Sequence, residues 1–270
     1  QKTNFIAGKS NYFVVEACEY ERSFLDLSPT MLIITNIEED HLDYYKDLAD
    51  IRSAFIELIA KLPEHGVLIL RKQEWEALAK QGLALLSKAE PDPALQSFKI
   101  KQYLDTPTDD LRLKIPGEHN IQNAQAVLSA AEILGIPREQ AVISLNNYAG
   151  TWRRFEYKGR IGGNGAAVYD DYAHHPTAVK ATIQGARELF GHQKRLFIVF
   201  QPHLYTRTKD FLPEFAQSFS GADEVVLTDI YAAREKDDGT IHARDMVSEI
   251  KKYQKKLLEA RPPEASDQVQ

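Results

Sequence analysis

The chain has 270 residues, of which 43% are hydrophobic and 27% charged, and this balance predicts a globular protein that can bury a core. Its net charge of −6 argues against a nucleic-acid-binding surface. One cysteine, Cys18, excludes an internal disulfide framework, and no apolar stretch is long enough to span a membrane, so we expect a cytoplasmic protein without nucleic-acid or membrane partners.

The first half of the chain alternates predicted strands and helices. Apolar runs predict strands at 12–17, 30–36 and 66–70. Helical spacing predicts helices at 48–62, 74–89, 121–134 and 139–147. The Pro-containing region between Gln96 and Lys114 could hold a small hairpin. Gly135 and Pro137 end the third helix, as residues of these types commonly do.

The pattern restarts near Gly150, where we place a domain boundary. Further strands are predicted at 166–169, 195–200 and 224–227. Further helices are predicted at 177–190, 210–220 and 243–256. Alternating strands and helices imply crossover connections, so we expect an α/β fold with mostly parallel sheets. The polar, Pro-rich residues 261–270 are expected to form a disordered tail.

The segment DDYAHHPT, at 170–177, lies between a predicted buried strand and a helix. Ligands bind at the carboxyl ends of strands in open α/β sheets, so this concentration of titratable groups indicates a functional loop. A structural interpretation makes Asp170 or Asp171 a helix cap and leaves His174 and His175 in solvent. We favour the functional interpretation, because one cap does not need four titratable neighbours.

A second polar segment, QPHLYTRT at 201–208, also follows an apolar strand. It would bring His203 and Arg207 to the same sheet edge as His174 and His175. Two histidine-bearing strand exits in one sheet favour a binding or catalytic site there.

Acidic residues and a histidine follow the first two predicted strands. Glu16 ends the first strand, and His41 follows the second among several carboxylates. If the two strands are parallel neighbours, Glu16 and His41 share a sheet edge and suit a divalent cation, with oxygen ligands favouring Mg²⁺. Alternatively, the acids from Glu38 to Asp40 cap the next helix, and both interpretations can hold together.

Two further motifs permit both structural and functional interpretations. His119, Asn120 and Asn123 lie around the first turn of the predicted helix at 121–134; they could contact a purine or ribose, but spacing alone favours an N-cap. Arg153 and Arg154, beside aromatic residues, suit a phosphate or carboxylate clamp, and a structural Arg–Glu pair is equally well supported.

Taken together, these motifs resemble those of the Mur ligase family, ATP-dependent amide-forming enzymes of peptidoglycan synthesis. The matching segments occur in the family's order, and the likeness extends to about residue 245. They are TNIEEDHLD at 35–43, GEHNIQNAQA at 117–126, WRRFE at 152–156, DDYAHHPT at 170–177 and QPHLYTRT at 201–208. The last two segments point to the family members that add L-alanine.

The resemblance implies a partial central ATP-binding domain at 1–149 and a C-terminal Rossmann-like ligase domain at 150–260. It also implies a role for each candidate residue. Glu16 and His41 would hold Mg²⁺, and the contacts to adenine and ribose would come from His119, Asn120 and Asn123. Arg154 with Arg153 would reach the phosphates, and Asp171 would face the nucleotide. The acyl-phosphate and amino-acid site would be lined by His175, His203 and Arg207.

The implied reaction uses ATP to convert the carboxylate of UDP-N-acetylmuramate into an acyl phosphate, which the amine of L-alanine then attacks. An imidazole of near-neutral pKa could position or deprotonate that amine. The sequence does not choose among His174, His175 and His203 for this role.

Some residues depart from the family pattern. The sequence contains no GxxGKT segment to hold phosphates, and it begins with Gln1, so we expect a truncated chain that is inactive alone. Leu204 stands where arginine is common, which puts one substrate contact in doubt. The alternatives are a murein tripeptide ligase of cell-wall recycling, which shares the architecture, and a non-catalytic nucleotide-binding remnant.

Overall fold

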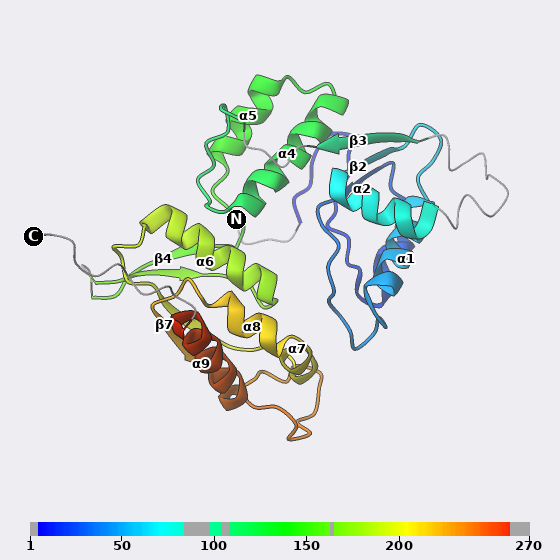
Figure 1. Cartoon of the computed structure of the whole chain (residues 1–270). Coiled ribbons are helices and arrows are strands. Elements are labelled where there is room, and N and C mark those ends of the chain that lie inside the picture. Colours follow the sequence, from blue (N-terminus) through cyan, green and yellow to red (C-terminus); the bar gives the residue numbers. More distant parts are fainter. Residues whose placement is uncertain (1–4, 84–97, 104–107, 163–164, 260–270) are drawn as a thin grey trace, which may run out of the picture. The chain divides into compact units, whose positions relative to one another are not determined.

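The computed structural model describes residues 5–83, 98–103, 108–162 and 165–259 (Figure 1). The chain divides into two compact units. Unit 1 comprises Gln1–Ile115 and His119–Trp152, and unit 2 comprises Pro116–Glu118 and Arg153–Gln270. Among the described helices, none combines the length and apolar composition that crossing a bilayer requires. The expected tail at 261–270 lies outside the described residues.

Unit 1 contains a parallel three-stranded sheet in the order β1 (Met31–Ile34), β2 (Val67–Arg71) and β3 (Lys99–Tyr103). The strands predicted at 30–36 and 66–70 are confirmed. β2 is the central strand, and its residues from Leu68 to Leu70 are fully buried, because helices cover both faces of such a sheet. The hairpin predicted between Gln96 and Lys114 is wrong: β3 pairs with β2 in parallel, so its partner comes from earlier in the chain.

Side chains of β2 alternate between two apolar clusters on opposite faces of the sheet. Leu68 and Leu70 pack in a cluster with residues of α1 (Leu48–Ile59), whereas Val67 and Ile69 pack in a cluster with residues of α4 (Glu118–Ile133). This alternation follows from the two-residue period of a strand. Unit 1 is therefore layered, with its sheet between helices (Figure 1).

One of the remaining helices of unit 1, η1 (Tyr20–Asp26), was not predicted. The others largely follow the expected ranges: α2 (Lys72–Leu78), the π-helical η2 (Ala79–Leu83) and α5 (Arg138–Asn147). The helix predicted at 74–89 corresponds to α2 and η2, and its last part lies outside the described residues. At Gly82 in η2, an added Cβ would lie 1.9 Å from Cδ1 of Ile56, so glycine permits α1 to approach closely.

The strand predicted at 12–17 is wrong. This segment has no strand structure, and the side chains of Phe13 and Val14 are 76% and 93% exposed. Apolar β-forming residues make a strand only where a neighbour completes the hydrogen-bond ladder. In the described part of unit 1, β1 pairs with β2 alone, so the segment has no such partner.

Unit 2 contains two strand pairs, one antiparallel and one parallel. β4 (Glu156–Arg160) pairs with β5 (Ala167–Asp170) in antiparallel fashion, and β6 (Phe197–Phe200) pairs with β7 (Glu224–Leu227) in parallel. The expected strands β5, β6 and β7 are confirmed, whereas β4 was not predicted because its sequence, EYKGR, carries no apolar signal. β5 is half-buried to exposed rather than buried, because among the described strands it pairs with β4 alone.

The helices of unit 2 are α6 (Pro176–Phe190), α7 (Tyr205–Asp210), α8 (Leu212–Ser218) and α9 (Ala243–Glu259). The helix predicted at 210–220 is confirmed as α8, which has Pro213 in its first turn, whereas α7 was not predicted. Proline cannot donate a helical hydrogen bond and is therefore favoured at a helix start. α8 packs against α6 and α9, and the rings of Phe215 and Phe219 on this side lie 5.6 and 5.4 Å from that of Phe200 in β6.

Arg187, near the end of α6, ties that helix to the loops that lead into β6 and β7. Its guanidinium donates hydrogen bonds to the backbone carbonyls of Gly221 and Lys194 at 2.8 and 2.7 Å. It also pairs with the carboxylate of Asp223 at 2.6 Å. The side chain is only 12% exposed, so these contacts fix the amino ends of the parallel strands.

Candidate functional site

The histidine-bearing segments after β5 and β6 meet in unit 2, as expected, but among the described strands β5 and β6 belong to two separate sheets and not to the one sheet that the sequence predicted. The ring centroids of His174 and His203 lie 6.0 Å apart. The rings of Tyr172 and Tyr231 extend this cluster at both ends, at 5.3 Å from His174 and 5.5 Å from His203. The result is a row of four planar side chains beyond the carboxyl ends of the strands, where α/β folds bind ligands.

His203 is held by contacts on two sides. Its backbone forms a bridge with Tyr231, and its Nδ1 lies 3.3 Å from a guanidinium nitrogen of Arg207, one helical turn later. Burial and the positive charge of Arg207 lower the pKa of His203, and His174 and Arg234 act in the same direction. The imidazole is therefore neutral at neutral pH and can accept a proton.

His175 occupies a different environment. It is the N-cap residue of α6, and its ring meets the ring of Phe211 edge-on at 4.9 Å. Its described ring contact is therefore apolar, and its predicted catalytic role stays a prediction. The helix-cap interpretation of Asp170 or Asp171 is wrong, because the cap position of α6 belongs to His175.

Asp171 organises the loop instead of capping the helix. Its carboxylate accepts hydrogen bonds from the backbone N–H of Phe155 at 2.8 Å, from that of Ala173 at 2.7 Å and from the hydroxyl of Thr182 at 3.3 Å. It thereby joins the WRRFE segment, its own loop and α6. The predicted contact of Asp171 with a nucleotide stays a prediction.

The paired arginines face the same tyrosine. The guanidinium carbons of Arg153 and Arg154 lie 5.1 and 5.7 Å from the ring centroid of Tyr172. Arg153 also makes an ion pair with Asp170 at 3.2 Å, while its backbone N–H donates to Glu156 at 3.0 Å. The structural interpretation therefore holds for Arg153, with Asp170 as the carboxylate partner, and the exposed Arg154 keeps its predicted phosphate role as a prediction.

In unit 1, the first turn of α4 carries the predicted purine-contacting residues. The helix begins at Glu118, so the N-cap interpretation of Asn120 is wrong and Asn120 lies inside the turn. His119 and Asn123 are exposed and stand four residues apart, so they share a helix face. At the carboxyl end of β2, Arg71 pairs with Glu74 at 2.7 Å and donates to Gln122 at 3.3 Å, which fixes this turn beside the sheet edge.

The expected pairing of Glu16 with His41 rested on a strand that is not present. His41 instead forms an ion pair with Glu19 at 3.2 Å, whereas Glu16 is exposed on the extended segment before η1. The hydrogen bond from His41 lowers the pKa of Glu19. Within the described ranges, no group of three or more His, Cys, Asp or Glu side chains could hold a metal ion. The described residues therefore do not assemble the expected Mg²⁺ site.

The cap predicted for the helix after this region is also wrong. The N-cap of α1 is Asp47, whose carboxylate accepts from the N–H of Asp50 at 2.9 Å, so the acids from Glu38 to Asp40 do not cap it. Asp40 instead accepts a hydrogen bond from the backbone N–H of His41 at 2.7 Å.

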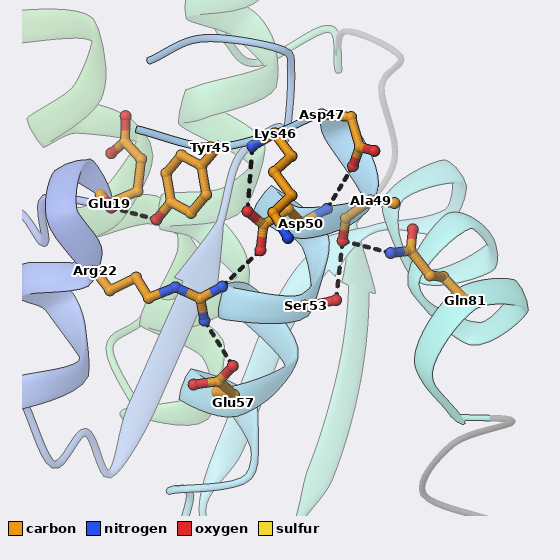
Figure 2. Close-up of polar contacts among 10 residues, drawn as sticks. All are labelled: Glu19, Arg22, Tyr45, Lys46, Asp47, Ala49, Asp50, Ser53, Glu57 and Gln81. Atoms are coloured by element: carbon orange, nitrogen blue, oxygen red, sulfur yellow. Dashed lines mark hydrogen bonds and ion pairs between the residues drawn. The ribbon is translucent and has the colours of Figure 1, made fainter. Parts of the chain in front are cut away.

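Figure 2 shows a polar network between Glu19, Arg22, Tyr45 and the residues of α1, which the sequence did not reveal. The buried hydroxyl of Tyr45 donates to the backbone carbonyl of Glu19 at 2.5 Å. Arg22 in η1 pairs with Asp50 at 2.7 Å and Glu57 at 2.6 Å, both on α1. The partners in these contacts are 26 or more positions apart, so no local sequence signal could have connected them.

The sequence matches the domain models of one enzyme family. The Mur ligase middle domain matches residues 3–131, and the Mur ligase, glutamate ligase domain matches residues 153–269. The chain belongs to the Mur ligase family. The α/β fold class expected from the sequence, with two Rossmann-like domains, is thereby confirmed.

Individual relatives carry a more specific name. The UDP-N-acetylmuramate–L-alanine ligase of Acetivibrio thermocellus is 39% identical over 265 residues, which cover 90% of this chain and 55% of the relative. That of Clostridium novyi is 41% identical over 261 residues, covering 92% and 56%. The chain thus spans about half the length of the curated relatives it matches.

Solved structures show the same likeness. The structure of UDP-N-acetylmuramate–alanine ligase from Thermotoga maritima matches with a TM-score of 0.58 and 25% identity, covering 86% of this chain and 51% of that one. The folylpolyglutamate synthase of Thermotoga maritima shares the fold with a TM-score of 0.53 and 20% identity, covering 89% of this chain and 58% of that one.

Proposed function

We propose that this chain serves an ATP-dependent ligase that joins L-alanine to the carboxylate of UDP-N-acetylmuramate in peptidoglycan synthesis. The observation that carries the proposal is the single cluster formed by the DDYAHHPT and QPHLYTRT segments, in which His174, His203 and Arg207 lie together. Relatives named for this activity are about 40% identical to the chain, which supports the same assignment. Because ATP drives the reaction, the proposal implies a cytoplasmic enzyme.

The first chemical step forms an acyl phosphate. A carboxylate oxygen of UDP-N-acetylmuramate attacks the γ-phosphorus of ATP, and ADP leaves with the bridging oxygen. Arg154 contacts the phosphates, since guanidinium groups match phosphate oxygens in geometry and charge, and Arg153 stands beside it in its ion pair with Asp170. His119, Asn120 and Asn123 contact the adenine and ribose, and Asp171 lies toward the nucleotide. We derive no step through Mg²⁺, because the described residues do not assemble a site for it.

The second step forms the amide bond. The amine nitrogen of L-alanine attacks the acyl carbon, and the tetrahedral intermediate collapses with cleavage of the carbon–oxygen bond to release phosphate. The amine must lose a proton, and His203 is suited to accept it because its lowered pKa keeps the imidazole neutral. Arg207 lies beside His203 and offers positive charge for the carboxylate of alanine or the leaving phosphate. His175 completes the proposed set of catalytic residues.

The test is phosphate release by the full-length gene product that contains this chain, supplied with ATP and UDP-N-acetylmuramate. We expect release with L-alanine as the acceptor and none without an amino acid. Release with a murein tripeptide instead would show the recycling ligase, and no release with either acceptor would favour a nucleotide-binding remnant. The 270-residue chain alone is expected to release no phosphate, because it has no GxxGKT segment to bind the nucleotide phosphates.

A further inference from the structure

Glu235 lies on the loop between β7 and α9, outside every motif that the sequence singles out. Its carboxylate accepts hydrogen bonds from the backbone N–H groups of Tyr205 and Thr206, the latter at 3.1 Å. The hydroxyl of Thr206 donates to the other carboxylate oxygen. Glu235 therefore holds the first turn of α7 with three hydrogen bonds, although it is about 30 residues away in the sequence.

The turn that Glu235 holds cannot maintain its conformation unaided. Leu204, immediately before α7, has a φ of 71°, a left-handed conformation that disfavours a branched side chain. Its N–H donates to the carbonyl of Tyr231 at 2.9 Å, and its side chain is 1% exposed. The backbone of His203 pairs with Tyr231 as well. The loop after β7 thus fixes the N-terminus of α7 at two points, through Glu235 and through Tyr231.

His203 lies just before the N-terminus of α7, and Arg207 lies within the helix. The imidazole precedes the turn and the guanidinium follows it, and their nitrogens approach to 3.3 Å. A change in the direction of α7 would move Arg207 relative to His203, because only Leu204 and the first turn connect them. Arg207 is 5% exposed, so its surroundings leave it little room to adjust.

We propose that Glu235 is a positioning residue for the proposed ligase reaction, which keeps His203 and Arg207 in place by holding the first turn of α7. The effect of Glu235 on catalysis rests on the proposed function, whereas its hold on α7 rests on the contacts described above. Glu235 acts through α7 and touches neither substrate nor reacting atom.

The charges around His203 support this role. Arg207, His174 and Arg234 lower the pKa of His203, whereas the negative charge of Glu235 raises it. Removing that charge without changing the shape of the side chain should therefore lower the pKa further. A residue that served only to stabilise α7 at a distance would not have this effect.

The first test uses the 270-residue chain. We expect Glu235→Gln to lower the pKa of His203, as followed by NMR of the histidine ring. Glu188→Gln removes the same charge from an exposed position on α6 and should leave the His203 titration unchanged. An unchanged pKa in Glu235→Gln, or an equal shift in both variants, would overturn the proposal.

The second test uses the full-length gene product. We expect Glu235→Ala to lower kcat about tenfold or more with little change in KM for ATP, and Glu235→Asp to restore part of the loss. Wild-type kcat in Glu235→Ala would refute the positioning role. A wild-type enzyme without alanine-dependent turnover would instead refute the proposed function, while the His203 titration tests the positioning by itself.

Discussion

Replacing Tyr45 with phenylalanine tests whether its buried hydroxyl stabilises unit 1. The side chain is 1% exposed, and its hydroxyl donates to the carbonyl of Glu19 at 2.5 Å. Tyr45→Phe keeps the ring and leaves that carbonyl without this donor, which should cost about 1–3 kcal/mol. For a domain of this size, the expected fall in Tm is about 3–8 °C.

The same substitution has a predicted pH signature. Burial raises the pKa of Tyr45 from 10.0 to about 12. The unfolded chain therefore ionises first, and stability that is fully present below pH 10 is lost as the pH rises towards 12. Over two pH units the loss is about 2.7 kcal/mol for this group. Tyr45→Phe lacks the ionisable group, so the stability difference from wild type should shrink as the pH rises above 10.

Urea denaturation followed by tryptophan fluorescence measures both effects, because Trp75 and Trp152 belong to unit 1. Tyr44→Phe is the matched control, since Tyr44 is 44% exposed and next in sequence. Equal stability of Tyr45→Phe and wild type at pH 7, or parallel losses of stability between pH 10 and 11.5, would refute the reasoning.

Three further substitutions test the packing, each measured by calorimetric or urea unfolding. Arg187→Met removes the donor to two backbone carbonyls and should destabilise unit 2 by about 2 kcal/mol; a stable variant would show that the loops do not need it. Gly82→Ala places a Cβ 1.9 Å from Ile56 and should cost about 1–3 kcal/mol, whereas Gly8→Ala, with no atom within 4 Å, should be neutral; equal effects would contradict the close approach. Leu204→Ala should cost about 2–5 kcal/mol because this side chain is fully buried, and a loss below about 1 kcal/mol would mean that its burial contributes little to stability.

Local patterns were sufficient to predict the elements that carry strong apolar signals. The run around Leu68 forms the central strand, and the spacing after Leu48 forms α1. β4 was missed because its residues are polar and its stability comes from pairing with β5. The strand at 12–17 was wrong for the converse reason: its residues favour strand structure, but no described neighbour completes the ladder.

The candidate site was predictable where titratable side chains follow directly after a predicted strand. The approach of His174 to His203 was expected from two strands ending at one sheet edge, and the two residues do lie together although β5 and β6 belong to separate sheets. The supporting contacts were not predictable, because they join residues distant in sequence. Glu235 is separated from Thr206 by 29 positions, and nothing in either segment indicates the other. His41 forms its ion pair with Glu19 and not with Glu16, because the segment before η1 does not continue the sheet.

The hydrogen bonds of the Asp171 carboxylate limit how segments of this protein can be exchanged. Arg153 and Phe155 adopt left-handed backbone conformations, with φ of 56° and 50°, although neither is glycine. Asp171 accepts a hydrogen bond from the N–H of Phe155 and Glu156 accepts one from that of Arg153, so the shape of WRRFE depends partly on a residue 16 positions after Phe155. The segments WRRFE and DDYAHHPT therefore form one structural unit. A chimera between relatives must exchange both together, because either one alone would lose the partner that gives it its shape.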